Sequence, residues 1–188
     1  MIPKSNLDEI EFLEKLVFDI RDVPGEIAEV GVYEGDTAEV IFNAMAKSKS
    51  SPLDWKAIHL FDTFEGFINE QILDGEPYKV GDLKSDYWTT YRKFEKFDNF
   101  KIYKGDIITT KDVVKDKMFS FVHLDVDIYK LTIACLEFFW PRISSGGIIL
   151  IHDYCFTNWG IIKAVNEFVA KYSIELKRGP SRWAYVKK

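Results

Sequence analysis

The chain has 188 residues, 47% of them hydrophobic and 15% aromatic, so it can bury one substantial core and is too short to promise two. Its formal net charge of −5 disfavours a nucleic-acid partner, because affinity for phosphates comes largely from Lys and Arg. No segment has the pattern of a signal peptide or the length of a membrane span, and Cys135 and Cys155 lack metal or redox spacing. We therefore expect a single unprocessed cytoplasmic domain over residues 1–188, with no membrane partner.

The first predicted element is an amphipathic helix over residues 5–23, which Pro24 ends, so that residues 1–24 form an N-terminal helical segment. Short apolar runs predict five strands, at residues 27–31, 57–61, 100–103, 119–124 and 147–151. Helical periodicity separates several of them, at residues 37–45, 131–140 and 161–172.

Strands that alternate with helices predict a parallel sheet covered on both faces, which is an α/β, doubly wound fold. Two final apolar stretches, residues 173–176 and 183–186, are separated by too few residues for a helical crossover, so we expect an antiparallel hairpin at the sheet edge. Residues 66–90 form the one long segment without a clear period. We call these residues the flap and expect them to bind the acceptor, because long loops in compact domains are usually functional.

A glycine turn follows the first strand, where Gly31 and Gly35 allow the backbone to approach a ligand closely. The free amides at the start of the next helix can receive an anionic group. Tyr33 stands where a dinucleotide-binding GxGxxG motif needs its second glycine, which argues against a nicotinamide cofactor. The alternative is a tight turn that binds nothing.

Two further acids follow strands at the same edge of the predicted sheet. Asp62 ends the second strand and is suited to accept hydrogen bonds from both hydroxyls of a ribose. Asp106 follows the third strand in a Gly-Asp pair, where it could lie near an adenine edge. The alternatives are a surface acid that caps the next helix for Asp62 and a plain turn for Asp106.

The strongest signal is a pair of acidic strand ends. Asp125 and Asp127 follow the fourth strand, and His152 and Asp153 follow the fifth. Neighbouring parallel strands bring these side chains into one crevice, where like charges are costly unless something positive lies between them. A divalent cation held by carboxylate oxygens is the simplest answer, and two unrelated helix-capping acids are the alternative.

Taken in order, these segments resemble the macrocin O-methyltransferase family of sugar-modifying, metal-dependent enzymes. The resemblance covers residues 29–37, 60–66, 101–106, 124–129, 146–154 and 160–168. It implies a class I methyltransferase fold with strand order 3-2-1-4-5-7-6 and an antiparallel strand seven. It also implies S-adenosyl-L-methionine and Mg²⁺ as cofactors, and a small-molecule hydroxyl acceptor from natural-product or glycan modification.

Carried over by motif, the resemblance assigns roles to particular residues. The cofactor site would consist of Glu29, Gly31, Val32, Tyr33, Gly35, Thr37, Asp62, Thr63, Asp106 and Asp125. Asp125 and Asp153 would bind the metal, and Asp127 would resemble the family's general base. The family usually has Asp-Asp where this chain has His152-Asp153, and an imidazole ligand would shift the preference towards Mn²⁺.

Three other functions stay open at this stage. A catechol-type O-methyltransferase also presents adjacent oxygens to a metal. An NAD-dependent oxidoreductase shares the fold but leaves the acidic cluster unexplained, and so does a non-catalytic nucleoside-binding module. A homodimer is also left open.

Overall fold

The structure is a computed structural model that describes residues 7–48 and 56–188. The predicted first turn of the N-terminal helix, residues 5 and 6, lies outside the described residues. In chain order the elements are α1 (Leu7–Asp19), β1 (Glu26–Val30), α2 (Asp36–Ser48), β2 (Ile58–Asp62), η3 (Asn69–Gln71), α3 (Tyr87–Phe94), β3 (Phe100–Lys104), α4 (Ile107–Thr110), η4 (Lys111–Val114), β4 (Phe119–Leu124), α5 (Tyr129–Phe139), η5 (Trp140–Arg142), β5 (Ile143–Ile151), α6 (Trp159–Tyr172), β6 (Lys177–Arg178) and β7 (Ala184–Lys187).

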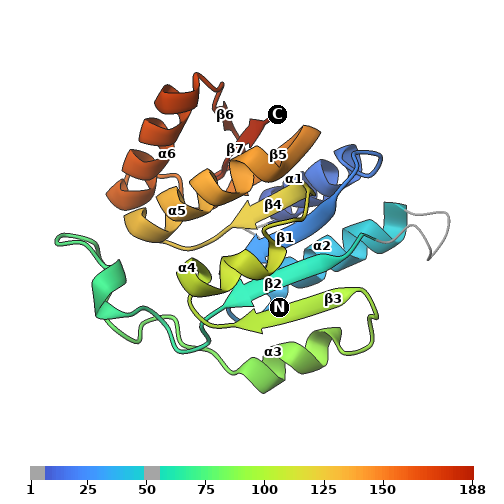
Figure 1. Cartoon of the computed structure of the whole chain (residues 1–188), viewed down its shortest axis with the longest axis horizontal. Helices are drawn as coiled ribbons and strands as arrows, with labels where there is room; N and C mark the ends of the chain where they lie inside the picture. Colours follow the sequence, from blue (N-terminus) through green and yellow to red (C-terminus); the bar gives the residue numbers. More distant parts are fainter. Residues whose placement is uncertain (1–6, 49–55) are drawn as a thin grey trace.

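The described strands form one seven-stranded sheet in the order β3-β2-β1-β4-β5-β7-β6 (Figure 1). Strands β1 to β5 pair in parallel, whereas β7 runs antiparallel to both β5 and β6. This order confirms the predicted doubly wound α/β fold. Because β1 to β5 are parallel, their carboxyl ends lie at one edge of the sheet, on the side where the flap extends in Figure 1.

The C-terminal hairpin differs from the prediction in one detail. Residues 173–176 are not a strand, and β6 consists only of Lys177 and Arg178. Ser173 ends α6 with a left-handed backbone, φ 52°, and its N–H donates to the carbonyl groups of Val169 and Ala170. The apolar residues that follow pack against the core from a loop, so their hydrophobicity reflects burial and not strand pairing.

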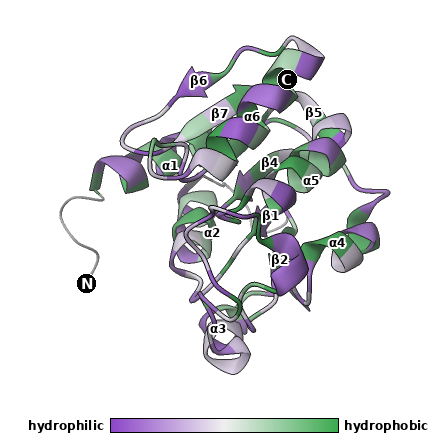
Figure 2. Ribbon diagram, turned by 90° about the vertical axis from the view of Figure 1, so that its left-hand side faces the viewer, coloured by the Kyte–Doolittle hydropathy of each residue, from purple (hydrophilic) through white to green (hydrophobic). Residues whose placement is uncertain are grey.

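The helices form two layers, one on each face of the sheet. Helices α4, α5 and α6 pack on one face around residues such as Val122, Leu136 and Phe168. Helices α1, α2 and α3 cover the other face around residues such as Leu13 and Phe42. Figure 2 shows hydrophobic residues gathered in the middle of the molecule and a hydrophilic edge strand β6. With both faces covered, the edge at the strand ends is left for a ligand.

The flap contains more local structure than its sequence predicted. It includes η3, and its last residues, Tyr87 to Thr90, form the first turn of α3. Asp86 caps this helix by accepting a hydrogen bond from the N–H of Thr89 at 2.7 Å. No helix in residues 7–48 and 56–188 has the length and apolar character needed to cross a membrane.

Candidate active site

A cavity of about 250 Å³ opens at the carboxyl ends of the parallel strands. Its wall includes predicted site residues from five strand ends, namely Gly31, Tyr33, Asp62, Thr63, Asp106, Asp125, Asp127, His152 and Asp153. Parallel pairing explains this convergence, because consecutive strands end at the same edge of the sheet. The predicted cofactor acids and the predicted metal ligands therefore share one cavity.

The glycine turn is fixed by close backbone packing. A Cβ atom on Gly31 would lie 1.8 Å from the carbonyl oxygen of Asp125, so this position tolerates only glycine. Tyr33 has a left-handed backbone, φ 52°, and its carbonyl accepts hydrogen bonds from the hydroxyls of Ser85 and Thr90, both at 3.0 Å. The flap therefore helps to hold the turn in place.

Asp62 connects the glycine turn to the end of β2. Its Oδ2 accepts a hydrogen bond from the N–H of Tyr33 at 2.7 Å, and its Oδ1 accepts one from the N–H of Phe64 at 2.6 Å. Burial raises the pKa of this carboxyl although backbone N–H groups favour its charged form. Each carboxylate oxygen can accept a further bond, so Asp62 can order the turn and still bind ribose hydroxyls.

Asp106 both caps a helix and lines the cavity. Its Oδ1 accepts a hydrogen bond from the N–H of Ile108 at 2.9 Å, at the start of the four-residue helix α4. Ile107 lines the cavity next to it. Asp106 therefore caps a helix, which neither the predicted adenine contact nor the plain-turn alternative anticipated, and its carboxylate still lies at the cavity wall.

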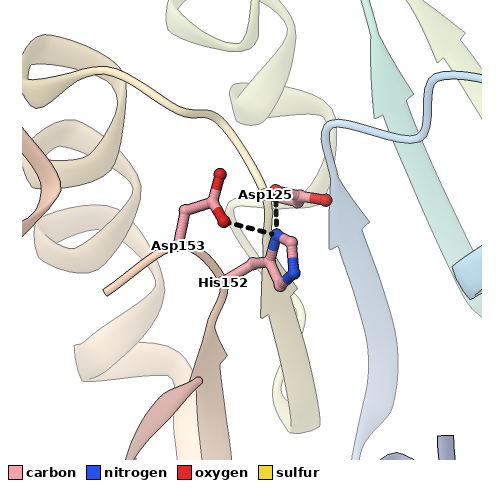
Figure 3. Close-up of side chains that lie close together, drawn as sticks. All are labelled: Asp125, His152 and Asp153. Atoms are coloured by element: carbon pink, nitrogen blue, oxygen red, sulfur yellow. Dashed lines mark hydrogen bonds and ion pairs between the residues drawn. The ribbon is translucent and has the colours of Figure 1, made fainter. Parts of the chain in front are cut away.

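Asp125, His152 and Asp153 form a compact cluster at the ends of β4 and β5 (Figure 3). The imidazole Nδ1 lies 2.9 Å from Asp125 Oδ1 and 3.5 Å from Asp153 Oδ1, with the ring between the two carboxylates. One ligand atom from each residue can be chosen so that all lie within 4.8 Å of one another. The cluster therefore brings together oxygen and nitrogen donors at a spacing that suits a metal ion.

The charges of this cluster favour a positive group between the carboxylates. Burial opposes the charge on His152, but the charge and hydrogen bond of Asp125 outweigh it and raise the imidazole pKa to about 9. Burial likewise opposes the charge on Asp125, yet His152 keeps the pKa of that carboxyl below its ordinary value. Asp153 Oδ1 lies 3.0 Å from Arg182 Nη1 as an ion pair, but it accepts no hydrogen bond from the described residues. Without a metal, protonated His152 and Arg182 supply the positive charge that the two carboxylates require, and a divalent cation would take over that role with His152 neutral.

Asp127 lies beside this cluster under unusual constraints. Its backbone is left-handed, φ 60°, and its carbonyl accepts a hydrogen bond from the Asn158 side-chain amide at 2.7 Å. Its Oδ1 accepts a hydrogen bond from the Tyr78 hydroxyl at 2.9 Å. Burial and then the charge of Asp125 raise the pKa of Asp127 to about 8, so this carboxyl can exchange a proton near neutral pH.

Four residues predicted for the cofactor site do not line the cavity. Glu29 is completely buried in β1, where its Oε1 lies 2.9 Å from His123 Nδ1. Val32 and Gly35 are buried within the turn, and Thr37 lies in the first turn of α2. Their roles in cofactor binding stay predictions, and from these positions they would act by shaping the turn.

The cavity also contains residues that sequence patterns did not identify. The flap supplies Phe67, Gln71, Asp82 and Leu83, and α5 supplies Leu131. Gln71 is 5% exposed, and its Nε2 donates to no described residue although it lies at the cavity wall. A buried amide donor without a partner is rare in a folded protein, and Nε2 can donate to a molecule that enters the cavity.

The strand order, the glycine turn after β1 and the acid at the end of β2 together define a class I methyltransferase fold. Two solved structures share this fold with TM-scores of 0.82 and 21% sequence identity: the O-methyltransferase NovP, matched over 97% of this chain and 80% of its own, and the calicheamicin methyltransferase CalS11, matched over 98% and 80%.

The chain belongs to the Macrocin-O-methyltransferase (TylF) family, whose sequence profile matches residues 1–177. It is 28% identical over 167 residues to mycinamicin III 3''-O-methyltransferase of Micromonospora griseorubida, which covers 81% of this chain. It is 24% identical over 185 residues to the 8-demethyl-8-(2,3-dimethoxy-alpha-L-rhamnosyl)-tetracenomycin-C 4'-O-methyltransferase of Streptomyces olivaceus, which covers 93% of this chain. The chain spans only 62% of the length of the first relative and 69% of the second.

Proposed function

We propose that the protein is an S-adenosyl-L-methionine-dependent O-methyltransferase that acts on a hydroxyl group of a small, sugar-like acceptor. The observation that carries this proposal is that two groups of predicted site residues, one for the cofactor and one for a metal and a base, line the same cavity. The Gly31 turn and Asp62 line one part of it, and the Asp125–His152–Asp153 cluster with Asp127 lines another. A methyl donor and a hydroxyl acceptor could meet there, shielded from water by the flap.

The cofactor side depends on backbone geometry and one carboxylate. The turn at Gly31 would let the methionine end of the cofactor approach the chain closely. Asp62 would accept hydrogen bonds from the ribose hydroxyls, and Asp106 would lie on the adenine side. S-adenosyl-L-methionine supplies a methyl group on a sulfonium, which is already electrophilic. The protein therefore mainly has to align the methyl group and the acceptor oxygen.

Asp125, His152 and Asp153 would hold a divalent cation, Mg²⁺ or Mn²⁺. The imidazole makes Mn²⁺ a realistic occupant, because nitrogen donors suit it better than they suit Mg²⁺. When bound, the metal would orient the acceptor hydroxyl and make it more acidic. Asp153 Oδ1 would then serve both the metal and its ion pair with Arg182 Nη1 at 3.0 Å.

Asp127 is the proposed general base. Its carboxylate would accept the proton of the acceptor hydroxyl as that oxygen attacks the methyl group. Burial and the neighbouring carboxylates raise its pKa to about 8, and a cation bound by those carboxylates would offset part of their repulsion. Asp127 would then be ionised at neutral pH and basic enough to act.

The acceptor class follows from the relatives. The Streptomyces olivaceus enzyme is named for a rhamnosyl substrate, and both relatives are named as O-methyltransferases. A catechol is the second acceptor class to test, because its adjacent oxygens also suit a metal. An NAD-dependent oxidoreductase is disfavoured, since Tyr33 occupies the turn where pyrophosphate binding requires glycine.

The test is calorimetric titration with S-adenosylhomocysteine, NAD, Mg²⁺ and Mn²⁺, followed by a methyl-transfer screen of free and nucleotide-linked sugars and of catechols. Micromolar binding of S-adenosylhomocysteine without NAD binding, together with transfer to a sugar hydroxyl, would support the proposal. Transfer to catechols alone would replace the acceptor class. Absence of S-adenosylhomocysteine binding would reject the function.

A further inference from the structure

The flap reaches the proposed base through one tyrosine. Tyr78 lies in the middle of the flap and is half-buried, and its hydroxyl donates a hydrogen bond to Asp127 Oδ1 at 2.9 Å. Its ring packs against Phe67 with centroids 5.0 Å apart, and Phe67 lines the cavity. The hydroxyl therefore has a fixed direction, set by the packing of its own ring.

Glu76, two residues before Tyr78, attaches the flap to the helix that follows Asp127. Its Oε1 accepts a hydrogen bond from the N–H of Tyr129, the first residue of α5, and its Oε2 accepts one from the N–H of Leu73, both at 2.7 Å. The side chain is 8% exposed, and a carboxylate at a helix N-terminus is favoured by the helix dipole. This flap residue thus serves as the cap of α5.

The first two residues of α6, Trp159 and Gly160, contact the same part of the flap. A Cβ atom on Gly160 would lie 2.3 Å from Glu76 Oε1, so only glycine leaves room for this carboxylate. The Trp159 indole N–H donates to the Gly75 carbonyl at 3.0 Å. The flap therefore contacts α5 and α6 through two successive residues, Gly75 and Glu76, and Tyr78 lies two residues further on.

Asp127 needs such support because of its own backbone. Its φ of 60° is a conformation that most L-residues avoid, and Asn158 holds it from one side through the backbone carbonyl. Tyr78 holds it from the other side through the carboxylate. Two side chains from different elements thus fix the peptide and the acid group of one residue.

We infer that Tyr78 is a positioning residue whose hydroxyl orients the carboxylate of Asp127, and that the flap is therefore part of the proton-accepting machinery as well as a cover for the acceptor. This inference rests on the proposed function for the role of Asp127 as a base. The hydrogen bond itself can be tested without turnover. The role is distinct from acceptor binding, because Tyr78 acts on the base and not on the substrate.

The first experiment measures amide hydrogen exchange in the flap of the full chain without ligands. The Leu73 amide, which donates to Glu76, and the Gly81 amide, which donates to the Phe67 carbonyl at 2.9 Å, report flap opening. Tyr78→Phe removes one hydroxyl, and Asp127→Gly removes the carboxylate at a backbone position that suits glycine. Each should accelerate exchange by up to about tenfold, which is the size expected for the loss of one buried hydrogen bond.

The double variant decides whether the two groups act together. If the hydroxyl holds the carboxylate, Tyr78→Phe with Asp127→Gly should exchange no faster than the more affected single variant. Additive acceleration would overturn the inference. Asp127→Asn is a second variant in case the glycine substitution fails to fold. It keeps an oxygen that can accept from Tyr78, so Tyr78→Phe should still accelerate exchange in that background.

The second experiment uses kinetics with the acceptor found in the screen. Tyr78→Phe should lower kcat about tenfold, while the acceptor KM and the Kd for S-adenosylhomocysteine change less than twofold. Tyr103→Phe is the matched control, because Tyr103 is also half-buried and its hydroxyl lies 3.0 Å from His59 Nδ1, outside the cavity wall. It should change neither kcat nor flap exchange. A Tyr78→Phe enzyme with wild-type kcat would overturn the positioning role. If the wild-type chain transfers no methyl group, the proposed function fails, and hydrogen exchange still decides whether Tyr78 holds Asp127.

Discussion

The substitution Asp62→Asn separates a structural role of this acid from a role in cofactor binding. The carboxylate accepts one hydrogen bond on each oxygen, from Tyr33 N–H at 2.7 Å and from Phe64 N–H at 2.6 Å. A carboxamide has only one acceptor oxygen, so one of these N–H groups would face an NH₂ group instead. Either the turn at Tyr33 or the segment at Phe64 that leads into the flap would lose its hydrogen bond to this side chain.

The expected magnitude follows from the loss of one charge-assisted hydrogen bond, about 1.5–3 kcal/mol when buried. Asp62 is partly exposed, so we expect the lower end of that range or slightly less, about 1–2 kcal/mol of unfolding free energy. For a domain of this size that corresponds to a fall in Tm of roughly 2–8 °C. A ribose hydroxyl that also depended on this oxygen would weaken S-adenosylhomocysteine binding by roughly tenfold or more.

Thermal unfolding and calorimetric titration of the same samples measure both effects. The matched control is Asp86→Asn, because Asp86 also accepts a backbone N–H, that of Thr89, but does not line the cavity, and Asn is an equally good helix cap. A fall in Tm with unchanged S-adenosylhomocysteine affinity would show that Asp62 serves the turn alone. That result would refute the assignment of Asp62 to the ribose.

Three further outcomes are expected. Asp153→Asn should weaken Mn²⁺ binding in calorimetry by at least about tenfold and leave S-adenosylhomocysteine affinity intact, and Asn tolerates the left-handed backbone of this position, φ 55°. Unchanged Mn²⁺ binding would remove Asp153 from the metal site. Gly160→Ala should lower the unfolding free energy measured with denaturant by about 1–3 kcal/mol, because the new methyl group displaces the buried Glu76 carboxylate from the start of α5. Gly→Ala within a helix usually increases stability, so a gain in stability would contradict this packing. Burial opposes the charge on Glu26, but hydrogen bonds from Lys117 and His59 outweigh it and lower the pKa of Glu26, so its ionised form adds stability above its ordinary pKa of 4.5, and this stability is lost as pH falls through the lower folded value. The Glu26→Gln variant should therefore be less stable than the wild type at neutral pH and equally stable near about pH 3. Stability curves that stay parallel across this pH range would refute this.

Several features of the site could be predicted from local sequence patterns. Hydrophobic periodicity located the central strands, and β4 has the predicted bounds. Asp62, Asp125 and Asp153 were found because each follows an apolar run, and parallel pairing requires such strand ends to meet. The hairpin at the sheet edge followed from loop length alone, although β6 was misplaced because buried loop residues resemble a strand.

The tertiary structure decided which side chains complete the site. Nothing in the flap sequence identifies Tyr78 as a partner of Asp127, since the contact joins residues 49 positions apart and depends on how the flap docks. Gln71 Nε2, which has no hydrogen-bond partner among the described residues, is likewise recognised only when the surrounding atoms are in place.

The sequence alone determined the class of fold, the edge of the sheet where the cavity lies and the acids at the strand ends. These features depend on local periodicity and on the general geometry of parallel sheets. The docking of the flap, the place of Gly160 beneath Glu76 and the contact from Tyr78 to Asp127 were decided only by the tertiary structure. They depend on packing between segments distant in sequence, where each side chain is fixed by neighbours that no local pattern specifies.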